Sequence, residues 1–196
     1  MPLERTQRHL RRLYAASADP WGHLTLDYER AKYADTLAAL DGMEARLVVE
    51  IGCGIGALTE LLAPQCAQLI AIDCVPDAVR RARARLARAP HVVVALGNAP
   101  DELPALAPDI VMLSEVLYFS TPEEIARLGR WCDANAAPDA RIVIVSWLGR
   151  TGEALDGAAS AQRMRAALGG WSCRSRLRAD YRIDVLERGA GGPHIP

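Results

Sequence analysis

The feature that most constrains this chain is a buried-strand pattern that runs directly into three glycines, Leu47–Gly56. Its aliphatic and β-branched residues predict a strand that is buried on both faces. Gly52, Gly54 and Gly56 follow where this strand must turn into a helix, which we expect over Ala57–Leu62. Glycine tolerates left-handed backbone angles and lets a ligand approach without a Cβ in the way, and a helix start leaves N–H groups unpaired. The stretch therefore predicts a cofactor-binding loop.

Two acidic residues indicate what kind of cofactor fits this loop. The spacing G-x-G-x-G differs from the dinucleotide pattern G-x-G-x-x-G, in which a helix start holds a pyrophosphate. Glu50 would repel such an anion, and a carboxylate there suits an amino group or a positive charge. Asp73 ends the next apolar run, Leu69–Ile72, roughly twenty residues beyond the glycines, where an acid can accept both ribose hydroxyls. We expect a cofactor with a positive charge and a free 2′-hydroxyl.

Beyond the loop, apolar runs alternate with helical patterns. Strands are expected at Leu69–Asp73, Val92–Leu96, Asp109–Ser114 and Arg141–Trp147, and helices at Asp77–Ala89 and Thr121–Asn135. Two final runs, Trp171–Arg178 and Tyr181–Arg188, lie only a few residues apart, which predicts a hairpin. The predicted fold class is α/β, a doubly wound, mainly parallel seven-stranded sheet with a C-terminal antiparallel hairpin.

Length and composition predict one domain. The 196 residues are 51% hydrophobic, enough for one substantial core. We expect residues 1–42 to form a helical lid or cap, 43–188 a Rossmann-like core and 189–196 a flexible tail. A net charge of −1 gives no bulk attraction to nucleic acid, and neither an apolar leader nor a bilayer-spanning run is present. The expected setting is the cytoplasm, with a small-molecule partner and no nucleic acid or membrane; the oligomeric state is left open.

The five cysteines give no support for a metal site or a disulfide framework. Their number is odd and none is spaced C-x-x-C. Cys53 lies inside the glycine loop, where a small residue in a tight turn is the simpler interpretation and a reactive thiol the alternative. We therefore expect no metal.

These motifs resemble a known family. E-I-G-C-G-I-G followed by A-I-D is similar to the first two motifs of the class I S-adenosylmethionine-dependent methyltransferases. S-E-V-L-Y, together with D-P-W-G and Y-E-R-A-K-Y near the N-terminus, looks most like nodulation protein S and its relatives, which N-methylate a deacetylated chitin-type oligosaccharide. The resemblance, from about Tyr14 to Glu187, implies S-adenosylmethionine as cofactor and N-methylation of an amino sugar or a deacetylated chitooligosaccharide-like acceptor.

The resemblance also implies a set of cofactor-binding residues. Arg30 would fork the methionine carboxylate, with a solvated arginine as the alternative. Asn98 stands where many relatives have an aspartate that accepts from the adenine amino group, and its carbonyl can still accept; a simple turn residue is the alternative. The full set of cofactor-binding candidates is Trp21, Arg30, Glu50, Gly52, Cys53, Gly54, Gly56, Asp73, Cys74, Asn98, Ala99 and Ser114.

Glu115 and Tyr118, just past the fourth strand, are the catalytic candidates. A carboxylate there can orient the ammonium form of an amine acceptor and help take its proton, and Tyr118 would orient the acceptor. The alternatives for Glu115 are capping a backbone N–H or pairing with an arginine. Two other functions stay open: an NAD-dependent oxidoreductase, which Glu50 and the glycine spacing disfavour, and a non-catalytic cofactor-binding domain.

Overall fold

The computed structural model describes residues 2–188, so the predicted tail at 189–196 lies outside the described residues. The helices are α1 (Pro2–Ala16), α2 (Asp27–Ala38), α3 (Ala57–Leu62), α4 (Pro76–Arg85), α5 (Pro122–Asn135) and α6 (Gly157–Ala167). The strands are β1 (Ala45–Ile51), β2 (Cys66–Asp73), β3 (Val92–Leu96), β4 (Ile110–Ser114), β5 (Arg141–Trp147), β6 (Trp171–Leu177) and β7 (Tyr181–Arg188).

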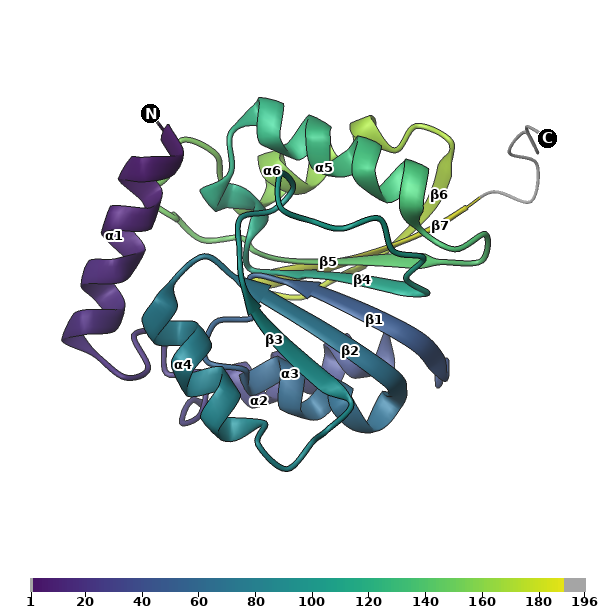
Figure 1. Cartoon of the computed structure of the whole chain (residues 1–196). Coiled ribbons are helices and arrows are strands. Elements are labelled where there is room, and N and C mark those ends of the chain that lie inside the picture. Colours follow the sequence, from purple (N-terminus) through teal and green to yellow (C-terminus); the bar gives the residue numbers. More distant parts are fainter. Residues whose placement is uncertain (1, 189–196) are drawn as a thin grey trace. The chain divides into compact units, whose positions relative to one another are not determined.

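The strands take the order β3-β2-β1-β4-β5-β7-β6 in a seven-stranded sheet (Figure 1). This order, with parallel pairs before an antiparallel β5-β7-β6 end, confirms the predicted α/β fold class. The chain forms two compact units, Met1–Pro104 and Ala105–Pro196. That all of it acts as one domain stays a prediction.

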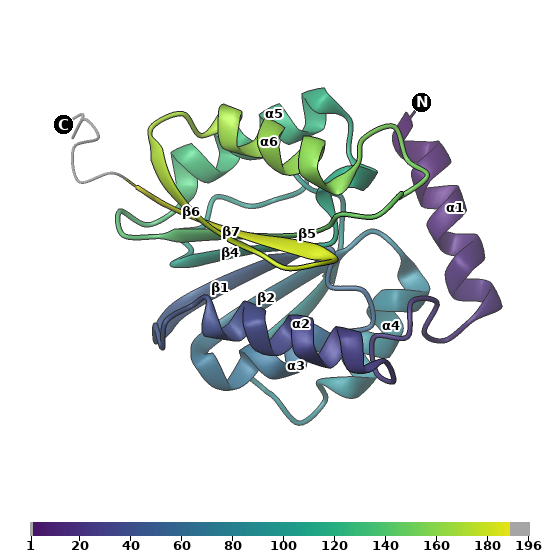
Figure 2. The same cartoon turned by 180° about the vertical axis from the view of Figure 1, so that it is seen from behind.

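In the first unit, three parallel strands carry the glycine loop. Val48 of β1 is paired with Leu69 of β2, and Leu69 with Val92 of β3. Helices α2, α3 and α4 lie on the same side of these strands (Figures 1 and 2). Val79 and Ala82 of α4 are buried, as its helical periodicity predicts. Because the ends of parallel strands meet at one edge, the loops after β1, β2 and β3 come together there.

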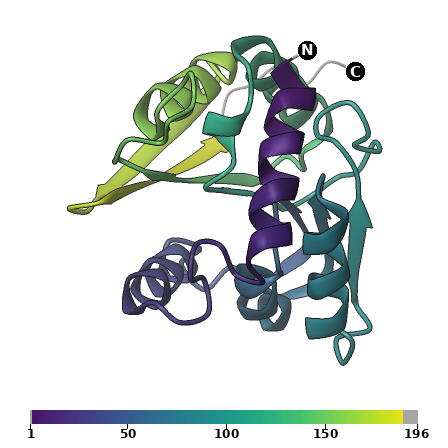
Figure 3. The same cartoon turned by 90° about the vertical axis from the view of Figure 1, so that its left-hand side faces the viewer.

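Helix α1 lies beside α4 (Figure 3). Arg81 of α4 holds its C-terminal end, because one guanidinium nitrogen, Nη1, donates to the carbonyl oxygens of Tyr14, Ser17 and Ala18 at 3.3, 3.1 and 3.1 Å. The last carbonyls of a helix lack partners within the helix. Arg81 therefore ties the C-terminal end of α1, and the residues that follow it, to α4.

In the second unit, β4 and β5 are parallel, and β7 pairs antiparallel with both β5 and β6. Helices α5 and α6 lie on the same side of these strands (Figures 1 and 2). Helix α5 begins with a capping box, in which the Thr121 side chain accepts from the Glu124 N–H and the Glu124 carboxylate accepts from the Thr121 N–H. A threonine N-cap, a proline at the start and two acids in the first turn thus give this helix a well-defined beginning.

The largest differences from the sequence prediction concern two helices and one strand. Helix α4 ends at Arg85 and not at Ala89, because Pro90 lacks an N–H and in a continued helix its ring would clash with the Leu86 carbonyl. Strand β2 begins at Cys66, three residues earlier than expected, because the polar Gln68 still pairs with Leu47. Helix α6 was not predicted, because its alanines, serine and arginines show weak apolar periodicity. The available signal was its N-cap, Asp156. The carboxylate of this residue accepts from the Ala159 N–H at 2.7 Å.

Candidate functional site

The glycine loop after β1 is shaped by left-handed backbone angles and by Asp73. Gly52, Gly54 and Gly56 have φ values of 77°, 55° and 79°. The Gly54 N–H donates to Oδ2 of Asp73 at 2.8 Å, and the Val75 N–H donates to Oδ1 at 2.8 Å. Burial raises the pKa of Asp73, and these N–H groups oppose the rise. Sequence reasoning correctly places Asp73 at the end of β2, and the structure joins it to the loop.

Helix α1 contributes one residue to this loop and one to the segment after β3, and the sequence analysis missed both. A Cβ added to Gly54 would lie 2.9 Å from the Tyr14 hydroxyl, so that hydroxyl sits against the loop. The Gln7 amide donates to the side-chain oxygen of Asn98, just past β3. Asn98 therefore has one lone pair of that oxygen occupied and one left for a ligand. The available signal was the buried pair Leu10 and Tyr14 at helical spacing, which indicates a packed face but not what it packs on.

Glu50, at the end of β1, is buried, with 2% of its surface exposed. Its Oε2 accepts from the Thr59 hydroxyl on α3 at 2.6 Å. Burial raises the pKa of Glu50 to about 7; the Thr59 bond opposes this rise, and the charge of Asp73 adds to it. A buried carboxyl with a raised pKa favours a positive charge nearby and disfavours an anion.

The other cofactor candidates in the first unit have varied surroundings. The Trp21 ring stands edge-on to the Tyr14 ring, with centroids 5.4 Å apart. Arg30 pairs with Asp27, and 61% of its side chain is exposed, as expected of the solvated alternative. Burial raises the pKa of Cys53 well above its ordinary value and that of Cys74 to about 11, so neither thiol is activated. Ala99 follows Asn98 after β3.

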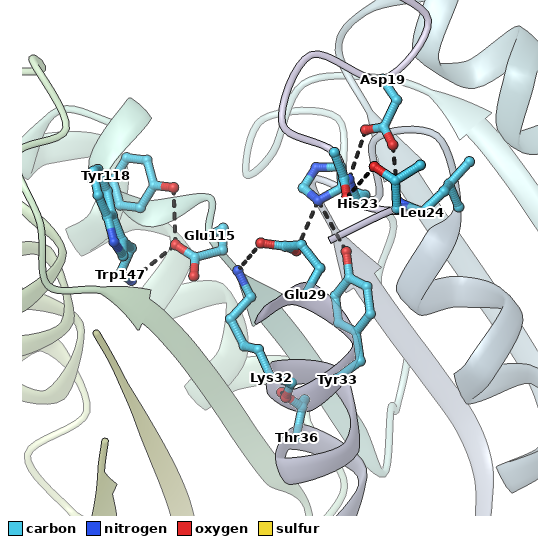
Figure 4. A network of polar contacts seen from close by, with 12 residues as sticks. Asp19, His23, Leu24, Glu29, Lys32, Tyr33, Thr36, Glu115, Tyr118 and Trp147 are labelled. Atoms are coloured by element: carbon cyan, nitrogen blue, oxygen red, sulfur yellow. Dashed lines mark hydrogen bonds and ion pairs between the residues drawn. The ribbon is translucent and has the colours of Figure 1, made fainter. Parts of the chain in front are cut away.

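In the second unit, the end of β4 carries Ser114, Glu115 and, one turn on, Tyr118. Glu115 has a φ of 56°, which is unusual for a residue with a side chain. Its Oε2 accepts from the Tyr118 hydroxyl at 3.0 Å and from the Trp147 N–H at 2.9 Å (Figure 4). The capping alternative is therefore present in the structure, and Trp147 is a partner that the sequence analysis did not identify.

Neither a metal-binding cluster nor a membrane-spanning helix occurs in residues 2–188. Within residues 2–188, no group of three His, Cys, Asp or Glu residues could hold a metal ion. Over the same residues, no helix combines the length and the apolar character that crossing a membrane requires.

Comparisons relate this chain to known proteins. The family described as Nodulation protein S (NodS) matches residues 4–130, more than half of the chain. Nodulation protein S of Bradyrhizobium diazoefficiens is 34% identical over 103 residues, 52% of this chain and 49% of that protein. Trans-aconitate 2-methyltransferase of Afipia carboxidovorans is 33% identical over 127 residues, 63% of this chain and 47% of that protein.

The solved structures include N-methyltransferase NodS from Bradyrhizobium japonicum WM9 in complex with S-adenosyl-L-homocysteine. It matches with a TM-score of 0.83 and 24% identity, over 93% of this chain and 98% of that chain. The likeness shows the class I methyltransferase fold. The chain spans about half the length of the curated relatives it matches. From the match over residues 4–130, the chain belongs to the nodulation protein S family.

Proposed function

We propose that this chain is an S-adenosylmethionine-dependent methyltransferase that acts on the nitrogen of an amino sugar or a deacetylated chitooligosaccharide-like acceptor. The observation that carries the proposal is the carboxylate of Asp73 bonded to the Gly54 N–H, in a loop whose second glycine has a φ of 55°. We further propose a cytoplasmic setting, with no nucleic-acid or membrane partner. Bound S-adenosylmethionine would supply an electrophilic methyl group on a sulfonium sulfur.

The residues of the loop fit this cofactor. Each Asp73 oxygen accepts one backbone N–H and keeps lone-pair capacity, so the two oxygens can accept the two ribose hydroxyls. Asn98 keeps an acceptor site for the adenine amino group. Glu50 favours a cationic cofactor, and the same carboxyl disfavours the pyrophosphate of an NAD-dependent oxidoreductase.

We assign acceptor orientation to Glu115 and Tyr118. Non-glycine residues with a positive φ cost about 1–3 kcal/mol and gather at functional sites, which supports a role for Glu115 beyond packing. The Trp147 N–H and the Tyr118 hydroxyl hold its carboxylate in one orientation. A fixed carboxylate attracts an ammonium group, and methyl transfer requires mainly that the acceptor be held in line with the methyl carbon.

The cofactor half is tested by calorimetry with S-adenosylhomocysteine and its 2′-deoxy analogue. A charge-assisted hydrogen bond contributes about 1.5–3 kcal/mol, so the analogue should bind the wild type roughly tenfold to a hundredfold more weakly. In Asp73→Asn this difference should shrink, because the amide presents one acceptor oxygen and an N–H₂ group. Equal affinity of the two ligands for the wild type would remove Asp73 from the ribose site.

The acceptor half is tested by transfer of labelled methyl from S-adenosylmethionine to a fully deacetylated chitin tetramer. The fully N-acetylated tetramer is the matched control, because it has the same sugars and no free amine. We expect label on the deacetylated tetramer alone. Binding of S-adenosylhomocysteine without any labelled tetramer would leave the cofactor proposal standing and refute the acceptor class. Labelling of both tetramers would indicate an oxygen acceptor.

A further inference from the structure

A cluster of polar side chains lies outside the cofactor loop, in the turn before α2 and in α2 itself. Glu29 and Lys32 are buried, with 4% and 2% of their surfaces exposed. The Glu29 carboxylate lies 3.0 Å from Nδ1 of His23 through Oε2, and 2.9 Å from the Lys32 ammonium through Oε1 (Figure 4). The Tyr33 hydroxyl lies 3.1 Å from the same His23 nitrogen. A partly exposed imidazole is thus held against a buried carboxylate.

This geometry determines where the His23 proton resides. A bare Nδ1 at 3.0 Å from a carboxylate oxygen would set two lone pairs against each other, whereas Nδ1–H donates a charge-assisted hydrogen bond. Burial alone would raise the pKa of Glu29, but the His23 bond and Lys32 outweigh it and lower the pKa to about 2. Glu29 therefore stays a charged acceptor. In neutral His23, Nε2 is then the nitrogen without a proton, and it has no hydrogen-bond partner among residues 2–188.

The cluster is continuous with the cofactor loop inside the first unit. The Asp19 carboxylate accepts from the N–H groups of His23 and Leu24, both at 2.9 Å, and so fixes the turn that carries the imidazole. The His23 ring centroid lies 5.7 Å from that of Trp21, and Trp21 contacts Tyr14. Since the Tyr14 hydroxyl sits against Gly54, a row of rings joins His23 to the loop.

We propose that His23 is the catalytic base of methyl transfer and that Glu29 is its positioning residue, an inference that rests on the proposed function. The acceptor ammonium gives one proton to Nε2, and Glu29 stabilises the imidazolium so formed. The freed nitrogen lone pair forms the bond to the methyl carbon, while the carbon–sulfur bond breaks and its electron pair goes to sulfur. A histidine whose far nitrogen is held by a carboxylate is a recurring arrangement for a base.

One observation favours His23 over Glu115 as the group that takes the proton. Oε2 of Glu115 already accepts two hydrogen bonds, so a proton there would displace one of them. The charged and titratable groups facing His23 are Glu29 and Tyr33 from α2 and Asp19 from its own turn, with Lys32 acting through Glu29.

The test combines kinetics and spectroscopy. His23→Asn can keep the hydrogen bond to Glu29, because the asparagine N–H₂ takes the place of Nδ1, but it lacks Nε2. Methyl transfer to the deacetylated tetramer should fall by about 10² or more, the scale of a lost acid–base group. S-adenosylhomocysteine affinity should be unchanged. Added imidazole should restore part of the rate in His23→Ala. Asp27→Asn, which removes an exposed carboxylate from the same first turn of α2, should retain the wild-type rate.

Nitrogen NMR of ¹⁵N-histidine-labelled protein tests the tautomer without turnover. We expect Nδ1–H in the wild type. In Glu29→Gln both tautomers should appear, since an amide can accept from Nδ1–H or donate to a bare Nδ1. Wild-type turnover in His23→Asn, or an Nε2–H wild type, would overturn the proposal. If the wild type methylates neither tetramer, the proposed acceptor fails, and the tautomer still decides whether His23 can be a base.

Discussion

The glycine loop of the first unit and the turn after β4 of the second unit each place a carboxylate beside left-handed backbone, but by different means. In the loop, glycines take φ values of 55–79° and the carboxylate comes from Asp73 on the next strand. In the turn, Glu115 itself has a φ of 56° and carries the carboxylate. In the loop, different residues provide the left-handed backbone and the carboxylate. In the turn, Glu115 provides both.

The difference shows where each region derives its rigidity. Glycine adopts left-handed angles readily, so the loop needs little compensation. The strain at Glu115 is of the order of 1–3 kcal/mol and must be offset by contacts. Strand β5 supplies them, because the Glu115 N–H donates to the Val145 oxygen at 2.9 Å and the Glu115 carboxylate accepts from the Trp147 N–H. We therefore expect substitutions in the loop to act on stability and cofactor binding, and those in the turn on turnover.

The largest expected effect comes from giving the loop a side chain. In Gly56→Ala, the left-handed angle costs about 1–2 kcal/mol, and a Cβ would lie 3.1 Å from the Ala82 Cβ and 3.3 Å from its Cα, which adds about 1–3 kcal/mol of overpacking. Gly42→Ala is the matched control, because Gly42 has a φ of 68° and nothing within 4 Å. Urea unfolding should show the smaller loss for Gly42→Ala; equal losses would mean that close packing is irrelevant at Gly56.

The second prediction concerns Glu50 and pH. Its folded pKa of about 7 lies above the ordinary 4.5, so the stability it contributes is full below pH 4.5 and is lost as the pH rises through 7. The unfolding free energy of the cofactor-free protein should fall on the order of 3 kcal/mol across this window. Glu50→Gln should remove this dependence and the exposed Glu44→Gln should keep it, as measured by urea unfolding at pH 5 and pH 8. The same slope in Glu50→Gln would assign it to another group.

The third prediction moves to the turn. Glu115→Gln preserves the shape of the side chain and removes the charge that attracts the acceptor ammonium, so methyl transfer to the deacetylated tetramer should fall roughly tenfold to a hundredfold, the scale of one charge-assisted hydrogen bond. S-adenosylhomocysteine affinity should not change, and Glu123→Gln, an exposed carboxylate on α5, serves as control. A parallel loss of cofactor affinity would move Glu115 into the cofactor-binding group and break the separation between the two regions.

The loop could be predicted from sequence because it requires left-handed backbone angles. Only glycine meets them without cost, so the requirement appears as Gly52, Gly54 and Gly56, and an acid after the next buried run marks Asp73. The parallel sheet was predictable for a similar reason, since strands buried on both faces leave continuous apolar runs. In these places one local physical requirement selects one residue type.

Contacts made across long stretches of chain left no such signal. Tyr14 contacts Gly54 only in the folded chain, and the residues around Tyr14 in the sequence do not indicate this contact. The partner that Glu115 finds on β5 is the main-chain N–H of Trp147, a group that every residue but proline offers. His23 is one of several polar and aromatic residues near the N-terminus, and only the structure shows its nitrogen against Glu29. In these places the contacts follow from the folded structure and not from a local sequence pattern.

The smallest expected effect is that of the Tyr118 hydroxyl. Tyr118→Phe removes one neutral donor from Oε2 of Glu115 and leaves the Trp147 N–H in place. The loss should be about 0.5–1.5 kcal/mol, or roughly twofold to twelvefold in methyl transfer. If Tyr118 acts only by holding Glu115, the double variant Glu115→Gln, Tyr118→Phe should be no slower than Glu115→Gln alone, because the two residues then share one interaction. Fully additive losses would show that the hydroxyl contacts the acceptor itself, and the turn would then hold two independent acceptor-binding groups in place of one strained carboxylate and its support.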